Sequence, residues 1–164
     1  MKNKSLLFVI LIVCIAFSLL FVGCSPLGEE IGEVTITIDC KTILNNRDKV
    51  EQSLIDNNLI PKDGIILPQT KVKVYSNESV YNVLIRVCKE NKIALDCDLE
   101  PMFQTYYVKG INHIYELSVG SSSGWLYFVN GEQVNYGVSL YKLQGGENIK
   151  FAYTVILGDC NEFN

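Results

Sequence analysis

Two segments near the start of the chain alternate between apolar and polar residues. Residues 34–40 read VTITIDC and residues 70–76 read TKVKVYS, so that an aliphatic side chain recurs at every second position. A period of two is typical of a half-buried β-strand. The segment between them has only weak helical spacing, through Val50 and Leu54, and ends in prolines and a glycine. We therefore predict two strands joined by a long, irregular connection.

One amphipathic helix is predicted after the second strand. Its apolar side chains recur at i, i+3, i+4, i+7 and i+8, at Val80, Val83, Leu84, Val87 and Cys88. Ser76 or Asn77 offers an N-cap oxygen just before this stripe. A single apolar stripe of this kind needs a partner surface, and we expect it to pack on a sheet.

The remainder of the chain is predicted to be mostly strand. Residues 94–104 have no clear period, whereas residues 105–110 and 113–119 read as strands around a turn. The pair Asn130-Gly131, flanked by apolar residues, is typical of a type I′ hairpin turn. Residues 149–157 alternate again. The order β-β-α-β-β-β favours a small α+β domain of the β-grasp kind, which we place at residues 34–160.

The first 23 residues have the features of an export signal. Lys2 and Lys4 precede an apolar run over residues 6–22, and Gly23-Cys24 ends that run in a pattern that resembles the bacterial lipobox. Three alternatives stay open: a lipoprotein signal cleaved before a lipidated Cys24, an uncleaved membrane anchor, and an ordinary secretory signal. Each exports the domain, with residues 24–33 as a tether.

Charge excludes one class of partner. The chain carries a net charge of −4, and removal of the signal segment takes away two lysines but no acid. No basic patch remains to neutralise a phosphate backbone, which argues against nucleic-acid binding. Lipid or an apolar helix must then hold the protein at the membrane, because no polybasic surface is present.

Four cysteines fall within the predicted domain, namely Cys40, Cys88, Cys97 and Cys160. An even number in an exported protein permits two disulfides, with three pairings. Cys88 lies on the apolar face of the predicted helix, so that a buried free thiol is the alternative there.

Catalytic and metal-binding residues are poorly supplied. His113 is the only histidine, and the serines of residues 119–124 have no assignable base. Asp96, Asp98 and Glu100 alternate like the start of a calcium loop, but the glycine and the final glutamate of an EF-hand are missing. We therefore predict no enzymatic activity, no catalytic residues and no metal site, with the acids forming a solvated edge.

Aromatic residues concentrate near the C-terminus, at Trp125, Tyr127, Tyr136, Tyr141, Phe151 and Tyr153. Trp125 and Tyr127 share one face of their predicted strand. One face must pack on the helix, so some of these rings belong to the core. Rings on the opposite face would form an exposed patch of the kind that marks recognition.

Residues 73–91, 106–117 and 122–154 together resemble a bacterial extracellular domain of unknown function. That family is similar to the C-terminal domain of transcobalamin and intrinsic factor. The resemblance implies a β-grasp-like fold and a cobalamin-like or other small ligand. In the vitamin carriers this domain contacts the cofactor together with a helical barrel that the present sequence does not contain, so that at most half of such a site is expected here.

We expect the ligand to meet the hairpin at residues 124–131 and the loop that follows it. The candidate ligand-binding residues are Trp125, Tyr127, Asn130, Tyr136, Gly124 and Gly137, the glycines by allowing close backbone approach. The predicted function is a membrane-anchored, extracytoplasmic binding module. The alternative is an envelope module that pairs with another protein and binds no small molecule.

Overall fold

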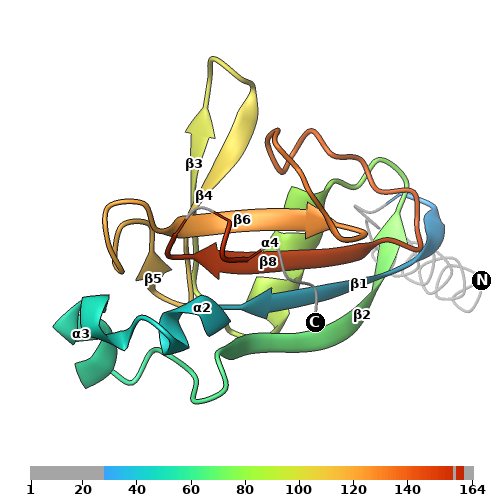
Figure 1. Ribbon diagram of the computed structural model, residues 1–164. Helices are drawn as coiled ribbons and strands as arrows, with labels where there is room; N and C mark the ends of the chain where they lie inside the picture. Colours follow the sequence, from blue (N-terminus) through green and yellow to red (C-terminus); the bar gives the residue numbers. More distant parts are fainter. Residues whose placement is uncertain (1–27, 157, 161–164) are drawn as a thin grey trace, which may run out of the picture.

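The computed structural model describes residues 28–156 and 158–160. The predicted signal segment and the lipidation site at Cys24 lie outside the described residues. Within those residues the architecture is α+β, as predicted: a five-stranded mixed sheet, a separate three-stranded sheet and one main helix (Figure 1). None of the helices described is long and apolar enough to cross a membrane.

The larger sheet has the strand order β2-β1-β8-β6-β7. Its strands are β1 (Glu30–Asp39), β2 (Ile65–Tyr75), β6 (Gly124–Val129), β7 (Glu132–Gln133) and β8 (Asn148–Thr154). Strands β1 and β8 run parallel, whereas the other neighbouring pairs are antiparallel. The first and last long strands of the chain therefore lie side by side in the middle of the sheet.

Strands β1 and β2 begin earlier than the alternation of their residues predicts. The register of β1 shifts between Glu30 and Gly32, and shifts again near Ile38, where β2 passes Leu67. A bulge interrupts the period of two without ending the ladder. The backbone pairing thus extends into residues whose side chains do not alternate.

The main helix α4 (Val80–Glu90) buries the stripe that its sequence predicts. Its N-cap is Ser79, not Ser76 or Asn77 as expected. The hydroxyl of Ser79 accepts from the backbone N–H of Asn82, and the Asn82 side chain accepts from the backbone of Ser79 in return. This reciprocal capping box satisfies two backbone donors and fixes the start of the helix.

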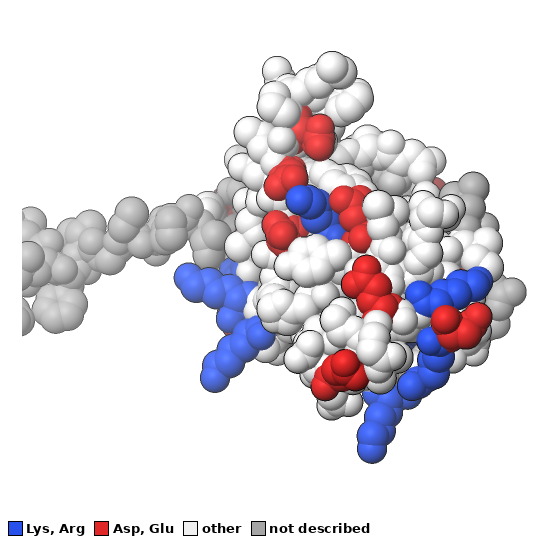
Figure 2. Space-filling view, turned by 90° about the vertical axis from the view of Figure 1, so that its left-hand side faces the viewer, with Lys and Arg blue, Asp and Glu red and all other residues white. Residues whose placement is uncertain are grey.

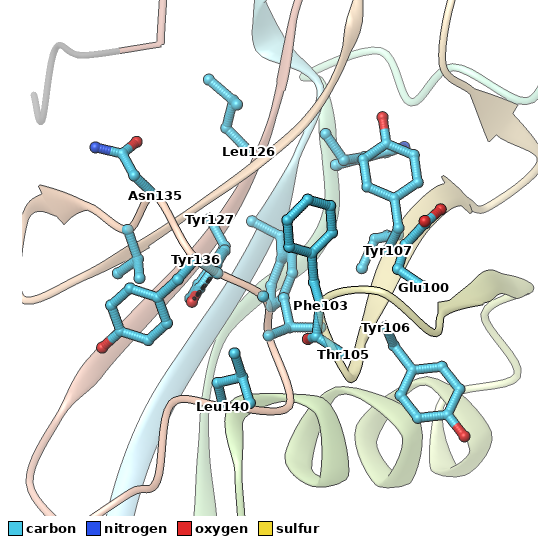
Figure 3. A pocket seen from close by; sticks show the side chains of 16 residues that line it. Glu100, Phe103, Thr105, Tyr106, Tyr107, Leu126, Tyr127, Asn135, Tyr136 and Leu140 are labelled. Carbon is cyan, nitrogen blue, oxygen red and sulfur yellow. Dashed lines mark hydrogen bonds between the residues drawn. The ribbon is translucent and has the colours of Figure 1, made fainter.

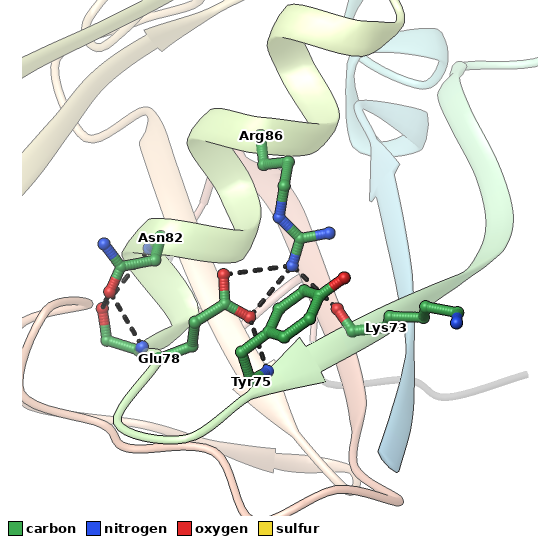
Figure 4. A network of polar contacts seen from close by, with 6 residues as sticks. Lys73, Tyr75, Glu78, Asn82 and Arg86 are labelled. Atoms are coloured by element: carbon green, nitrogen blue, oxygen red, sulfur yellow. Dashed lines mark hydrogen bonds and ion pairs between the residues drawn. The ribbon is translucent and has the colours of Figure 1, made fainter. Parts of the chain in front are cut away.

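Glu78 joins the start of α4 to strand β2 (Figure 4). Its carboxylate accepts from the backbone N–H of Tyr75 at 3.0 Å and pairs with Arg86 at 3.0 Å. Arg86 also donates to the carbonyl oxygen of Lys73 and lies over the ring of Tyr75. Glu78 is only 7% exposed, so the pair anchors the helix at the edge of the sheet.

The long connection after β1 contains short helices, α2 (Lys41–Leu44) and α3 (Gln52–Asp56), with a 3₁₀ turn between them. Each short helix buries one aliphatic side chain, Ile43 and Leu54 respectively. Such isolated contacts explain the weak helical spacing of the sequence.

The smaller sheet consists of β3 (Leu95–Glu100), β4 (Thr105–Ile111) and β5 (Ile114–Tyr115). Residues 95–100 are therefore strand, so the expectation that residues 94–104 are irregular was wrong for this part, whereas residues 101–104 form the turn. The predicted strand at residues 113–119 is only two residues long. The β3–β4 hairpin projects from the body of the molecule, away from the larger sheet (Figure 1). Strand β3 was not predicted because it contains Asp96, Asp98 and Glu100, and acidic residues are depleted in β-strands.

The hairpin turn predicted at Asn130-Gly131 is present between β6 and β7. Both residues have positive φ, 51° and 90°, as a type I′ turn requires. The side chain of Asn130 also accepts from the backbone N–H of Asn148 at 2.8 Å. This turn leads into the loop of residues 134–147 that returns the chain to β8.

Candidate functional site

A cavity of about 620 Å³ lies between the β3–β4 hairpin, strand β6 and the loop of residues 134–140 (Figure 3). Its lining is mostly apolar and is rich in aromatic rings. The lining residues are Glu100, Phe103, Thr105, Tyr106, Tyr107, Val108, Trp125, Leu126, Tyr127, Val134, Asn135, Tyr136, Gly137, Val138, Leu140 and Phe151. We call this space the aromatic cavity.

Buried aromatic residues of the larger sheet form its floor. Trp125 is 7% exposed, and its indole N–H donates to the carbonyl oxygen of Ile114 at 2.8 Å. The rings of Tyr127 and Phe151 stack with their centroids 5.8 Å apart. These side chains belong to the core and line the cavity at once, so the floor is rigid.

The loop of residues 134–140 is tied to the floor by specific contacts. The hydroxyl of Tyr127 donates to the carbonyl oxygen of Tyr136 at 2.7 Å. The hydroxyls of Thr105 and Ser139 share a hydrogen bond of 2.8 Å, which joins the loop to β4. A Cβ at Gly137 would overlap the side chain of Thr105. The loop therefore packs against both sheets and forms a fixed wall.

Partly exposed apolar side chains form the rim. Phe103 is 67% exposed, Tyr136 is 52% exposed and Leu140 is 48% exposed. Figure 3 shows Tyr136 on one side of the cavity and Tyr107 with Glu100 on the other, with Phe103 between them. Large exposed apolar groups around a concave apolar space are typical of a binding site.

The surroundings of two phenol groups of the cavity, Tyr107 and Tyr127, disfavour their ionisation. Burial raises the pKa of Tyr127 above its ordinary value. Burial, together with the carboxylate of Glu116, raises the pKa of Tyr107 to about 12. The hydroxyl of Tyr107 donates to Glu116 at 2.6 Å. Glu100 is the one charged side chain among the lining residues.

The candidate residues from the sequence divide into two groups. Trp125, Tyr127, Tyr136 and Gly137 line the aromatic cavity, whereas Gly124 and Asn130 do not. Asn130 holds the hairpin turn, as described above. The proposed role of the glycines also changes, because the missing side chain of Gly137 makes room for Thr105.

The sequence reasoning missed the contribution of the β3–β4 hairpin to this site, which includes Glu100, Phe103 and Tyr107. One signal could have found it. Met102 and Phe103 are bulky apolar residues in an otherwise polar segment that follows Pro101. Exposed apolar residues at a hairpin tip are unusual unless something binds there.

The four cysteines of the domain are free thiols in the structure. Cys88 lies in the buried stripe of α4, and Cys160 packs against Phe128 and Ala152. Burial raises the pKa of all four thiols, Cys40 and Cys97 included, to about 12. In this arrangement they act as small apolar side chains.

The acidic strand residues do not form a metal site in the described part of the chain. No group of three His, Cys, Asp or Glu side chains there could hold an ion. Asp98 instead pairs with Lys109 across β3 and β4 at 3.1 Å.

The chain was compared with curated proteins and with solved structures. No curated protein matches the chain by sequence. In the crystal structure of haptocorrin in complex with Cbi, the match covers 76% of this chain and 25% of the haptocorrin chain, with a TM-score of 0.52 and 13% sequence identity. The present chain thus spans about a quarter of haptocorrin.

A second solved structure, from Ruminococcus gnavus ATCC 29149, has a name that proposes metal binding. It matches 75% of this chain and 96% of its own, at 13% identity and a TM-score of 0.43. Residues 77–155, just under half of the chain, match the model of a domain of unknown function, DUF4430. Part of this chain therefore resembles the DUF4430 model, and its fold is similar to part of the haptocorrin fold.

Proposed function

We propose that this protein is an extracytoplasmic binding module whose aromatic cavity holds a cobalamin-like or other small ligand. The observation that carries the proposal is the cavity itself, a rigid aromatic floor beneath a rim of exposed rings. The fold similarity to haptocorrin, solved with Cbi, supports a ligand of that class. At 13% sequence identity this similarity shows a shared fold only, so the identity of the ligand is part of our proposal.

Apolar contact supplies most of the binding energy in this account. The hydroxyls of Thr105, Tyr107 and Tyr127 already have partners within the protein. Phe103 and Tyr136 are exposed and lie on different elements around the cavity, so a flat ligand can cover both rings. Burial of one large apolar side chain contributes about 1.5–3 kcal/mol.

Binding, not catalysis, is the activity that we propose for this site. Among the lining residues, the hydroxyls of Thr105, Tyr107 and Tyr127 are engaged in structural hydrogen bonds, and the one carboxylate lies at the rim. A nucleophile needs a base within hydrogen-bond reach.

Attachment to the outer face of the cell membrane completes the proposal. The sequence around Cys24 supports lipidation after cleavage, with an uncleaved anchor as the alternative. Metabolic labelling with a palmitate analogue tests this part. Label on the wild-type protein and none on Cys24→Ala supports lipidation, whereas equal label on both contradicts it.

Calorimetric titration tests the binding proposal. The full chain in detergent is titrated with cobalamin and with cobinamide, as wild type, as Phe103→Ala and as the control Ile55→Ala. Ile55 is 50% exposed on α3 and does not line the cavity. We expect micromolar or tighter binding, about −8 kcal/mol, which Phe103→Ala weakens and Ile55→Ala leaves unchanged. No heat from either corrinoid would overturn the vitamin analogy.

A second candidate function, pairing with another envelope protein, draws on the tip of the β3–β4 hairpin. Leu99, Met102 and Phe103 are 56%, 86% and 67% exposed. Such a patch can dock a partner protein. This function would be favoured over the first if the wild-type protein purifies in a complex with a partner, the Met102→Ser variant does not, and no corrinoid binds.

A further inference from the structure

We propose that the ligand of the aromatic cavity is an organic cation, with its positive charge on an apolar or aromatic body. This inference rests on the proposed binding function and adds the charge class of the ligand. The charge that lines the cavity, the aromatic rings within it and the charged groups around its rim all favour a cation.

The charge of the lining residues has one sign. Glu100 lies at the rim, and the lining contains no lysine, arginine or histidine. An anionic ligand would therefore enter an apolar space without a cation to pair with. Burial of an unpaired charge is costly, so such a ligand is disfavoured.

Aromatic faces supply the second attraction. Trp125 lines the space from β6. Tyr127 of β6, Tyr136 of the loop and Phe103 of the hairpin also surround it (Figure 3). The face of an aromatic ring is negative and attracts a cation within about 6 Å of its centroid. A ring-lined space with a carboxylate at its mouth therefore fits a cation better than a neutral or anionic body of the same shape.

The surroundings of the rim are acidic as well. Lys109 on β4 interacts with Asp98, Asp96 and Glu116, and Glu116 also accepts the hydroxyl of Tyr107. Together with Glu100, these acids outnumber the one lysine among them. Figure 2 shows acidic side chains gathered on one face of the molecule around a basic one. The local field thus attracts cations towards this side of the cavity.

A sugar or another polyhydroxyl ligand fits less well. The buried hydroxyl of Tyr127 donates to the carbonyl oxygen of Tyr136, and that of Thr105 pairs with Ser139. These two hydroxyls are therefore not free to match the hydroxyls of a sugar. An unmatched polar group in such a site lowers affinity.

Two ions of equal shape and opposite charge test the inference, tetraphenylphosphonium and tetraphenylborate. Each is titrated calorimetrically into the full chain as wild type, Phe103→Ala, Glu100→Gln and Glu90→Gln. Glu90 is an exposed acid at the end of α4 and lies outside the cavity lining, so its variant controls for the net charge of the protein.

We expect the cation to bind at least about tenfold tighter than the anion. Phe103→Ala should weaken its binding, and Glu100→Gln should reduce the cation preference about threefold, whereas Glu90→Gln should not. Equal binding of both ions, with Phe103→Ala weakening both, would overturn the charge inference and leave the binding site intact. Cation binding that Phe103→Ala leaves unchanged would place the ion elsewhere and also overturn it. If neither these ions nor a corrinoid binds, the proposed function itself fails.

Discussion

The hydroxyl of Tyr127 donates a hydrogen bond to the backbone carbonyl oxygen of Tyr136 at 2.7 Å. Tyr127 belongs to the buried floor of the aromatic cavity, and Tyr136 is half exposed at its rim. This bond therefore holds the wall of the cavity in place from its floor. The bond uses the main chain of Tyr136 and not its ring, which stacks on Tyr141 and remains 52% exposed for contact with a ligand.

Tyr127→Phe separates the support of the loop from its contacts with a ligand. The variant leaves the stacked ring in place and removes only the hydroxyl. We expect a loss of about 1 kcal/mol in the free energy of unfolding, and faster amide exchange over residues 134–140. Urea denaturation and hydrogen exchange measure the two effects.

Tyr136→Ala is the matched variant for that bond. It keeps the carbonyl oxygen and removes the exposed ring, so ligand affinity should fall while the denaturation midpoint changes little. If Tyr136→Ala destabilises the fold as much as Tyr127→Phe does, the ring is structural and does not act as a ligand contact.

Gly137→Ala should damage the protein, whereas Gly124→Ala should be tolerated. A Cβ at Gly137 would overlap Thr105, but at Gly124 its nearest neighbour is Glu116 at 3.8 Å. Overpacking typically costs about 1–3 kcal/mol. Thermal denaturation of the two variants measures the difference. Equal stability of both would show that the loop does not pack on β4 as described.

Glu78→Gln tests the anchor of the main helix. The substitution removes the charge that balances Arg86, whose side chain is 21% exposed, and we expect a loss of about 2 kcal/mol. Lys73→Ala provides the comparison, because the pair of Lys73 and Glu30 is solvent-exposed and should contribute little. Urea denaturation in which the two variants lose equal stability would contradict the anchoring role.

Asp159 gives the fold a specific dependence on low pH. Burial acts to raise the pKa of its carboxyl, but hydrogen bonds from Thr154, Ile156, Cys160 and Val155 outweigh burial, and the pKa lies below its ordinary value. A carboxyl with a lowered folded-state pKa stabilises the fold above its ordinary pKa of about 3.9. That stability is lost as the pH falls through the folded-state value.

Asp159→Asn should therefore be less stable than the wild type at neutral pH, and the difference should shrink below about pH 4. Urea midpoints measured over this range test the prediction. A difference that grows as the pH falls has the opposite sign and would exclude this role of Asp159.

Local patterns in the sequence predicted most of the larger sheet and the main helix. The alternation at residues 34–40 and the stripe from Val80 to Cys88 each reflect one buried face of one element. Each pattern can therefore be recognised within its own segment of the sequence. The Asn130-Gly131 turn was predicted for the same reason, since its geometry depends on those two residues. Strand β3 was missed because its pairing with β4 is not visible in the pattern of its own side chains.

The sequence predicted the part of the site that comes from β6 and the following loop, but not the part that comes from the β3–β4 hairpin. Trp125, Tyr127, Tyr136 and Gly137 come from neighbouring segments of the chain, and their composition indicated a binding edge. Phe103 reaches the same cavity only through the tertiary position of the β3–β4 hairpin. No periodic pattern within a single segment predicts that Phe103 lies close to β6 and the loop. The sequence also could not show that Trp125 serves the core and the cavity together.

Trp125 is the only tryptophan of the chain and lines the aromatic cavity, so its fluorescence reports directly on what enters. We would titrate cobinamide into the wild-type protein and into Phe103→Ala, with N-acetyltryptophanamide as the control for light absorbed by the ligand. Our account predicts saturable quenching in the wild type and a midpoint shifted about tenfold or more to weaker binding in the variant. Quenching that matches the free tryptophan control, or that is identical in Phe103→Ala, would contradict it.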